Sequence, residues 1–243
     1  MSLIVRITTC AAVLVAAIPA ATSAGAQGVA SSQGYQDPPE SIRRILDAPP
    51  AATGSVSPDG KWIVIAAREP AVTTIADMAE PTLYLAGRRF HPIASYRVDT
   101  VGIRSMRLRP VSGSAAKPVP VPAGGRIAQY AWSPDGHMIA YTTVDKTLGM
   151  GIKLFPVSTA TEIPVSAAGL RGKLGAPSWS HDGKYVALTE ATRNGTALWM
   201  VNVATHTAKR VTPYTINTVT GGCDWLSKAP QLVCIMNVAA RGA

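Results

Sequence analysis

The chain has 243 residues, of which 47% are hydrophobic and 15% are charged, and its formal net charge is +9 at pH 7. This apolar content is sufficient for a folded core and excludes an intrinsically disordered chain. The basic residues are scattered, with no basic helix, zinc finger or aromatic RNA-binding motif beside them. We therefore interpret the surface as mildly basic and expect no nucleic-acid partner.

Residues 1–26 have the pattern of a secretory signal peptide. Arg6 supplies the positive charge, residues 7–18 form an apolar stretch, and Ala24-Gly25-Ala26 resembles a cleavage site. A membrane anchor is the alternative, but the apolar run is shorter than the roughly 20 residues that a spanning helix needs. No lipobox precedes Cys10, which argues against a lipoprotein. We expect a secreted or periplasmic protein with no membrane association after signal removal.

Residues 27–50 are predicted to form a polar linker and a short docking helix. Asp37 is expected to cap the helix, with Pro38 at its first position and Glu40 completing a capping box. The prolines at 49 and 50 would end it. The apolar face of this helix would consist of Ile42, Ile45 and Leu46.

A four-residue motif occurs three times, at Ser57–Gly60, Ser133–Gly136 and Ser180–Gly183. Two copies read Ser-Pro-Asp-Gly, and the third has histidine in place of proline. These residue types suit a type I turn, and each copy lies between two strand-like runs, so we predict three hairpins. The serines are 76 and 47 residues apart, and a further 47 residues lead to Ser227, where we expect a degenerate fourth copy.

The second and third copies define a unit of four short strands. Trp132 or Trp179 stands just before each turn. Asn194-Gly195 predicts a further hairpin in the third unit. The strands expected after the turns span 138–143, 151–157 and 161–165 in the second unit, and 185–189, 196–203 and 208–212 in the third.

The first copy has strands on both sides of its turn, at 54–56 and 62–66, and its longer spacing to the second copy indicates an insertion. Within the insertion, we expect one helical turn in residues 69–81 and an added strand in residues 82–90. Residues 102–109 alternate apolar and basic side chains, which predicts a half-exposed strand.

Four antiparallel strands repeated every 47 residues are typical of β-propeller blades. We therefore predict an all-β fold with a short N-terminal helix. Residues 51–243 would form a partial β-propeller of four-stranded antiparallel blades, three complete and half of a fourth. Such an open stack exposes a blade face and a strand edge, which indicates a truncated propeller. Pairing of the open edge with a second copy is the alternative.

Cys223 and Cys234 are the cysteines that remain once the predicted signal peptide is removed. A four-residue connection centred on Lys228 and Ala229 would place them directly opposite each other across the fourth hairpin. A cross-strand disulfide is one interpretation, and two buried free thiols are the other.

The sequence shows no recognisable catalytic or metal-binding pattern. No Gly-x-Ser-x-Gly nucleophile elbow surrounds a serine, and no glycine loop suits a phosphate. The aspartates of the repeated turns are expected to cap the backbone. We expect no catalytic residue, no metal and no cofactor in this chain. The histidines are not spaced to share a metal: His91, His137, His181 and His206.

Several segments in order resemble the start of the prolyl oligopeptidase family of serine peptidases, in particular its secreted glutamyl endopeptidase type. The turn motifs are shared with periplasmic TolB-like propellers, whereas the segments Ile45–Pro50 and Leu85–Pro92 are more specific to the peptidase family. The segments that carry the resemblance are Tyr35–Pro39, Ile45–Pro50, Ser57–Gly60 and Leu85–Pro92.

In that family an N-terminal propeller precedes an α/β-hydrolase domain that carries Ser, Asp and His, and it admits only peptides or flexible segments. The resemblance implies that this chain lacks that C-terminal domain, is inactive alone, and gates or positions peptide substrates in the full enzyme. It also implies that Arg88 and Arg89 lie near the substrate passage and attract acidic side chains. Solvated edge residues are the alternative for these arginines. A non-enzymatic TolB-like propeller that binds a protein partner is the alternative function.

Overall fold

The structure is a computed structural model that describes residues 37–68, 79, 81–90, 92, 102–145, 149–218, 221–227 and 229–237. The predicted signal peptide and most of the helical turn predicted at 69–81 lie outside these residues. Within the described ranges, no helix is long and apolar enough to cross a membrane.

The N-terminal helix, α1, spans Glu40–Leu46 and begins later than we predicted. The N–H of Arg43 donates to the carbonyl of Pro39, so the N-cap is Pro39 and not Asp37. The Glu40 carboxylate is not engaged as a capping box predicts, because it pairs with Arg43 one turn further on, at 2.7 Å. All seven helical residues are exposed, so docking of the apolar face stays a prediction.

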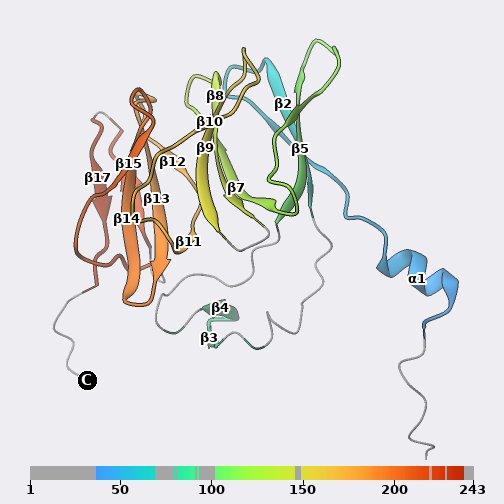
Figure 1. The fold of residues 1–243 in the computed structure, drawn as a ribbon, viewed down its shortest axis with the longest axis horizontal. Coiled ribbons are helices and arrows are strands. Elements are labelled where there is room, and N and C mark those ends of the chain that lie inside the picture. The colour runs from blue at the N-terminus through green and yellow to red at the C-terminus, as the bar shows by residue number, and fades with distance from the viewer. Residues whose placement is uncertain are drawn as a thin grey trace, which may run out of the picture. The chain divides into compact units, whose positions relative to one another are not determined.

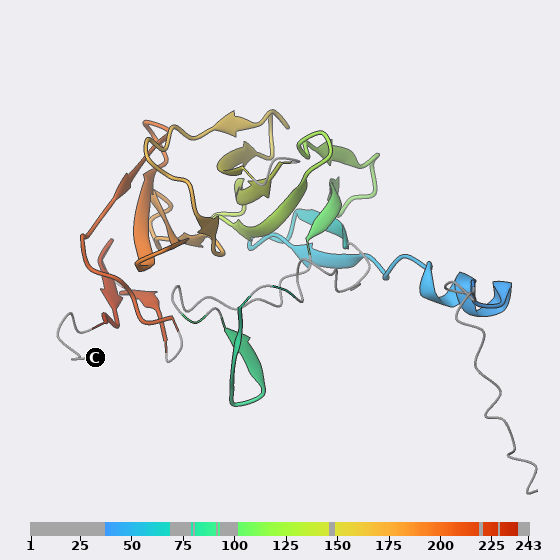
Figure 2. The ribbon, with the colours of Figure 1, turned by 60° about the horizontal axis from the view of Figure 1, so that its bottom comes forward.

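Most of the described strands form three antiparallel blades and the first hairpin of a fourth (Figures 1 and 2). Blade 1 consists of β1 (Thr53–Val56), β2 (Trp62–Arg68), β5 (Ile103–Pro110) and β6 (Lys117–Val119). Blade 2 consists of β7 (Arg126–Trp132), β8 (Met138–Val144), β9 (Met150–Pro156) and β10 (Ile163–Pro164). Blade 3 consists of β11 (Lys173–Leu174), β12 (Ser178–Trp179), β13 (Tyr185–Thr192), β14 (Gly195–Asn202) and β15 (Thr207–Arg210). Blade 4 is represented by β16 (Cys223–Trp225) and β17 (Leu232–Cys234).

Neighbouring strands of blades 2 and 3 follow one another in the chain, as the repeat predicts, whereas in blade 1 the insertion separates β2 from β5. In blade 3 the first strand is split into β11 and β12, which both pair with β13. Blades 1 and 2 are also joined into one sheet, because Ile103 of β5 pairs with Ile127 of β7. The predicted partial propeller of antiparallel blades is confirmed.

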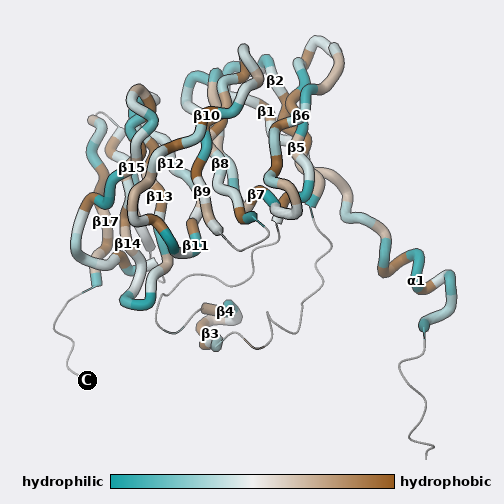
Figure 3. Tube along the Cα trace, viewed as in Figure 1, coloured by the Kyte–Doolittle hydropathy of each residue, from teal (hydrophilic) through white to brown (hydrophobic). Residues whose placement is uncertain are grey.

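Consecutive blades pack against each other through apolar clusters. Apolar residues recur along the strands of the blades, coloured brown in Figure 3. Side chains alternate between the two faces of a strand, so one strand serves two clusters. On β8, Ile139 and Tyr141 pack with residues of blade 1, whereas Ala140 packs with residues of blade 3. A third cluster joins blade 3 to blade 4 and contains Ile216, which is fully buried.

The repeated four-residue motif forms the same hairpin turn in all three copies. In blade 2, the buried Ser133 donates its hydroxyl to Asp135 at 2.6 Å and accepts the N–H of Met138 at 2.9 Å. The Gly136 N–H closes the type I turn on the Ser133 carbonyl at 3.0 Å. The other two copies repeat these bonds, so the aspartates are confirmed as turn residues.

The fourth copy is present, but its register differs from our prediction by one position. In the first three copies the serine N–H bonds to the carbonyl five positions later, and in blade 4 the N–H of Leu226 bonds to Gln231 in this way. Leu226, and not Ser227, therefore occupies the serine position. Leucine has no hydroxyl for the turn bonds, which explains why this copy looks degenerate in sequence.

The tryptophan before each turn links its blade to the preceding one. The indole nitrogen of Trp179 donates to the carbonyl of Ala131 in blade 2 at 3.1 Å. Trp132 donates to Ser55 of blade 1, and Trp225 to Ser178 of blade 3, each also at 3.1 Å. The regular spacing of the motif thus reflects these indole contacts between blades as well as the turns themselves.

The segment 82–90 is a hairpin and not the single strand that we predicted. Its strands are β3 (Leu83–Leu85) and β4 (Arg88–Phe90), which pair antiparallel. Ala86 and Gly87 connect them with φ angles of 48° and 74°, which indicates a two-residue type I′ turn. Because alanine rarely adopts a left-handed conformation, the sequence pattern did not reveal the turn.

The strand predicted at 102–109 is β5, but its alternation is interrupted. Ala67 pairs with Ser105 while Arg68 pairs with Ile103, so Arg104 is the extra residue of a β-bulge. Ile103 and Met106 are consequently both buried although they are three positions apart. The strict period of two was wrong at this point.

Acid is expected to weaken the blade turns. The Ser133 hydroxyl holds the pKa of Asp135 below its ordinary 3.8, and the matching serines lower the pKa of Asp59 and Asp182. An aspartate whose pKa is lower in the folded chain than in the unfolded chain stabilises the fold at pH values above its unfolded-state pKa. This stabilisation is lost as the pH falls through the folded-state pKa. Ser133→Ala should therefore lose less stability on acidification than the parent chain, measured as the urea midpoint against pH. The exposed Ser158→Ala is the control, and an unchanged acid dependence in Ser133→Ala would contradict the prediction.

Candidate functional site

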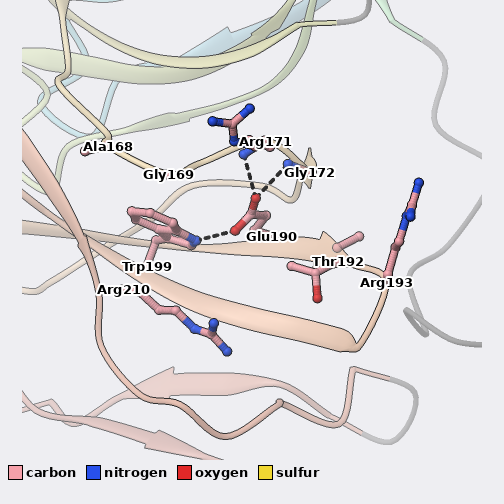
Figure 4. Close-up of a pocket in the computed structure, with 10 residues that line it drawn as sticks. Ala168, Gly169, Arg171, Gly172, Glu190, Thr192, Arg193, Trp199 and Arg210 are labelled. Atoms are coloured by element: carbon pink, nitrogen blue, oxygen red, sulfur yellow. Dashed lines mark hydrogen bonds between the residues drawn. The ribbon is translucent and has the colours of Figure 1, made fainter.

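A cleft of about 720 Å³ lies on blade 3, where the residues that connect blades 2 and 3 cross the sheet (Figure 4). We call residues 165–172 the crossing segment. The N–H of Ala208 in β15 donates to the Ser166 carbonyl at 2.7 Å, which attaches this segment to blade 3. An adjoining cleft of about 370 Å³ shares Ala168, Trp199 and Arg210 with the first. We call both clefts together the blade 3 groove.

A buried carboxylate, Glu190 of β13, attaches the crossing segment to the sheet. This residue is only 5% exposed. One oxygen accepts the backbone N–H groups of Arg171 at 2.8 Å and Gly172 at 2.6 Å, and the other accepts the Trp199 indole N–H at 2.6 Å. A buried carboxylate is tolerated when donors surround it in this way. Glu190 therefore acts as a positioning residue for the groove wall.

Close backbone approach at Gly172 is part of the same arrangement. A Cβ at this position would lie 2.0 Å from the carbonyl oxygen of Ala191 and 2.8 Å from Cγ of Glu190. Glycine therefore allows the two N–H groups of the crossing segment to reach the carboxylate together.

Three arginines line the groove from different elements (Figure 4). Arg171 belongs to the crossing segment, Arg193 to the β13–β14 connection, and Arg210 to β15. The Arg210 guanidinium donates to the carbonyls of Thr212 at 3.0 Å and Pro213 at 3.2 Å, which hold it in place. Arg171 and Arg193 are exposed. The groove thus combines a fixed buried carboxylate with exposed cations at its rim.

The hairpin that carries Arg193 was predicted, but its loop residues differ. Thr192 pairs with Gly195, so Arg193 and Asn194 form the connection and Gly195 opens β14 with a φ of 118°. This register places Arg193 at the end of the hairpin, beside the groove.

The arginines singled out from the sequence lie elsewhere, on β4. Arg88 pairs with Leu85 and is exposed, while Arg89 pairs with Tyr84 and is half-buried. Adjacent strand residues point to opposite faces, so the two guanidinium groups are not directed to one site. A role in substrate binding stays a proposal.

Cys223 and Cys234 pair directly across β16 and β17, in the register that the sequence predicts. Their Cα atoms are 4.1 Å apart and their sulfur atoms are joined. The bonds of the flanking pairs, Ile235 to Gly222 and Leu226 to Gln231, place the cysteines at a non-hydrogen-bonded position. Side chains approach most closely at such positions.

We expect the two cysteines to be oxidised in the purified protein. Iodoacetamide added to unreduced, unfolded chain should leave Cys223 and Cys234 unlabelled, and prior reduction should expose both, as measured by peptide mass spectrometry. Labelling of both residues without a reductant would instead favour the free thiols.

The histidines, which we considered above as metal ligands, are turn or bend residues wherever the structure describes them. His137, His181 and His206 lie in turns or bends, and His91 lies outside the described residues. Among the described side chains, no group of three or more metal-ligating residues comes together. Sequence reasoning missed the blade 3 groove, although Glu190 within the apolar run of β13 was a signal that could have indicated it.

Repeated four-stranded antiparallel blades that pack face against face define this chain as a partial β-propeller. No protein-family model matches the sequence. The chain is 32% identical over 127 residues to the "Probable glutamyl endopeptidase, chloroplastic" of Arabidopsis thaliana, in a match that covers 50% of this chain and 13% of that protein. It is 41% identical over 58 residues to the Tol-Pal system protein TolB of Alcanivorax borkumensis, covering 24% of this chain and 13% of that protein.

Solved propeller structures are more distant. The β-propeller domain of the Trilobed protease from Pyrococcus furiosus has a TM-score of 0.41 at 11% identity, covering 68% of this chain and 44% of that chain. The structure described as "putative TolB from Agrobacterium tumefaciens" has a TM-score of 0.41 at 16% identity, covering 79% of this chain and 72% of that chain. The sequence matches to the Arabidopsis thaliana and Alcanivorax borkumensis proteins each span about an eighth of the length of those relatives.

Proposed function

We propose that this chain contributes propeller blades to a secreted or periplasmic serine peptidase of the prolyl oligopeptidase type, of the glutamyl endopeptidase kind. The observation that carries the proposal is the 32% identity over 127 residues to the Arabidopsis thaliana protein. The signal-peptide pattern of residues 1–26 supports export. In this proposal the chain has no catalytic residue of its own, and an α/β-hydrolase domain encoded further on supplies Ser, Asp and His.

The blades would gate or position peptide substrates for that domain. Interblade cores and the indole links of Trp132, Trp179 and Trp225 hold consecutive blades against each other. Walls connected in this way would restrict entry to flexible peptides and exclude folded proteins. Arg88 is the better placed of the two proposed substrate contacts, because it is exposed whereas Arg89 is half-buried.

The second candidate is a non-enzymatic TolB-like periplasmic propeller that binds a protein partner. The 41% identity over 58 residues to the Alcanivorax borkumensis protein favours it. In that case the blades would form a binding surface and no hydrolase domain would accompany them.

Reading the coding sequence beyond codon 243, and labelling its full product with a fluorophosphonate, separates the two candidates. The peptidase proposal expects a Gly-x-Ser-x-Gly segment, covalent labelling of its serine and cleavage of peptides. Further blades followed by a stop codon, with no labelled serine, would overturn it and leave the binding protein.

A further inference from the structure

The blade 3 groove carries more positive than negative charge. Its main cleft is lined by Arg171, Arg193 and Arg210 against one acid, Glu190. The adjoining cleft adds Lys209. Because both oxygens of Glu190 already accept hydrogen bonds from the protein, this carboxylate is directed into the wall and away from a ligand. The net potential in the groove therefore favours anions.

The arginines differ in how they are held. Arg210 is fixed by two backbone carbonyls, so its guanidinium is already oriented. For the side chains of Arg171 and Arg193, no hydrogen bond or ion pair to another described residue is found, and both residues are exposed. Their guanidinium groups stand on separate elements around the cleft (Figure 4). Among the described residues no partner occupies these donors, so they are available to a ligand at two separate points of one groove.

The groove is not a requirement of the repeated blade. In blade 2 the strand register places other residues at the positions of Glu190, Trp199 and Arg210. The cation among these second-blade residues is Lys153. Its charge is neutralised, because it donates to both oxygens of Glu162 at 2.8 Å. The side chains at the three equivalent positions of the second blade are Thr143, Lys153 and Pro164.

We propose that the blade 3 groove binds a small ligand that carries two or more oxyanion groups, carboxylates or phosphates. Arg171 and Arg193 each form charge-assisted hydrogen bonds to one group of the ligand, while Arg210 supplies a fixed positive wall. A cleft of about 720 Å³ is within the size range of small-molecule sites and exceeds the volume of a single ion. This inference is independent of the proposed peptidase role.

Isothermal titration of the full chain at low ionic strength tests the proposal, with citrate as the carboxylate probe and pyrophosphate as the phosphate probe. Arg171→Gln/Arg193→Gln should weaken binding of at least one probe by about tenfold or more, since two charge-assisted bonds are lost. The matched control is Arg104→Gln/Arg107→Gln, which removes the same charge from exposed positions of β5 and should change affinity by less than about twofold.

Comparison of the two probes identifies the preferred oxyanion. Absence of binding for both probes, or equal weakening by the groove and control variants, would overturn the proposal, since equal weakening means general attraction to a basic protein. Phenylglyoxal footprinting of the unmutated chain is a second measurement that does not depend on variant folding. A bound probe should protect Arg171 and Arg193 and leave Arg104 reactive, and no difference in protection would also overturn the site.

Discussion

Trp179→Ala is expected to lower the free energy of unfolding by about 4 kcal/mol, the usual range for removing a buried tryptophan. The side chain is only 9% exposed and belongs to the cluster between blades 2 and 3. Its removal also leaves the Ala131 carbonyl without the indole donor. Urea unfolding followed by circular dichroism measures the change, provided that the slope of the transition is unaltered.

Trp179→Phe separates the two contributions of this side chain. Phenylalanine keeps most of the buried ring but not the hydrogen bond, so we expect a smaller loss of about 2 kcal/mol, from one bond and reduced packing. If alanine and phenylalanine destabilised the chain equally, the packing between the blades would not be the main contribution of Trp179.

Glu190→Ala is expected to cost about 3 kcal/mol, because it leaves three donors of a buried site without their acceptor. These donors are the backbone N–H groups of Arg171 and Gly172 and the indole N–H of Trp199. Release of the crossing segment should also increase proteolysis near residue 171. Urea unfolding and limited trypsin digestion measure the two effects.

Two other variants make the Glu190 prediction specific. Glu190→Gln keeps one carbonyl acceptor but directs an amide donor at another donor, so its cost should be intermediate. Glu162→Ala removes a carboxylate whose side chain is 32% exposed and which accepts from Lys153 and from the Tyr141 hydroxyl, and water can replace part of this bonding. A loss for Glu190→Ala no larger than that for Glu162→Ala would contradict a structural role for the buried carboxylate.

The features that the sequence predicted correctly are those with local causes. Ser133, Asp135 and Gly136 form their turn through bonds within a short stretch of chain, and the same residue types recur at a fixed spacing. The pairing of Cys223 with Cys234 follows from the length of one hairpin. The blades that this chain contains, and the order of their repeated strands, could therefore be predicted from the repeat.

The incorrect predictions concern conformations or contacts that residue type does not reveal. Ala86 takes a left-handed conformation to reverse the chain, and Arg104 is accommodated as a bulge because β2 and β5 must keep Ile103 and Met106 in the core. Likewise the prediction that Asp37 caps α1 used a motif, whereas the helix begins where its first backbone bond forms, at Pro39.

Local chemistry and spacing were sufficient to identify the blades, their turns and the class of fold, because a turn and its flanking strands are short-range structures. The blade 3 groove depends on the packing of distant segments. Glu190 meets the N–H groups of residues 171 and 172 across 19 and 18 positions of the chain. Neither segment carries a motif for this contact, so the groove with Arg171, Arg193 and Arg210 becomes visible when the crossing segment is packed on the sheet.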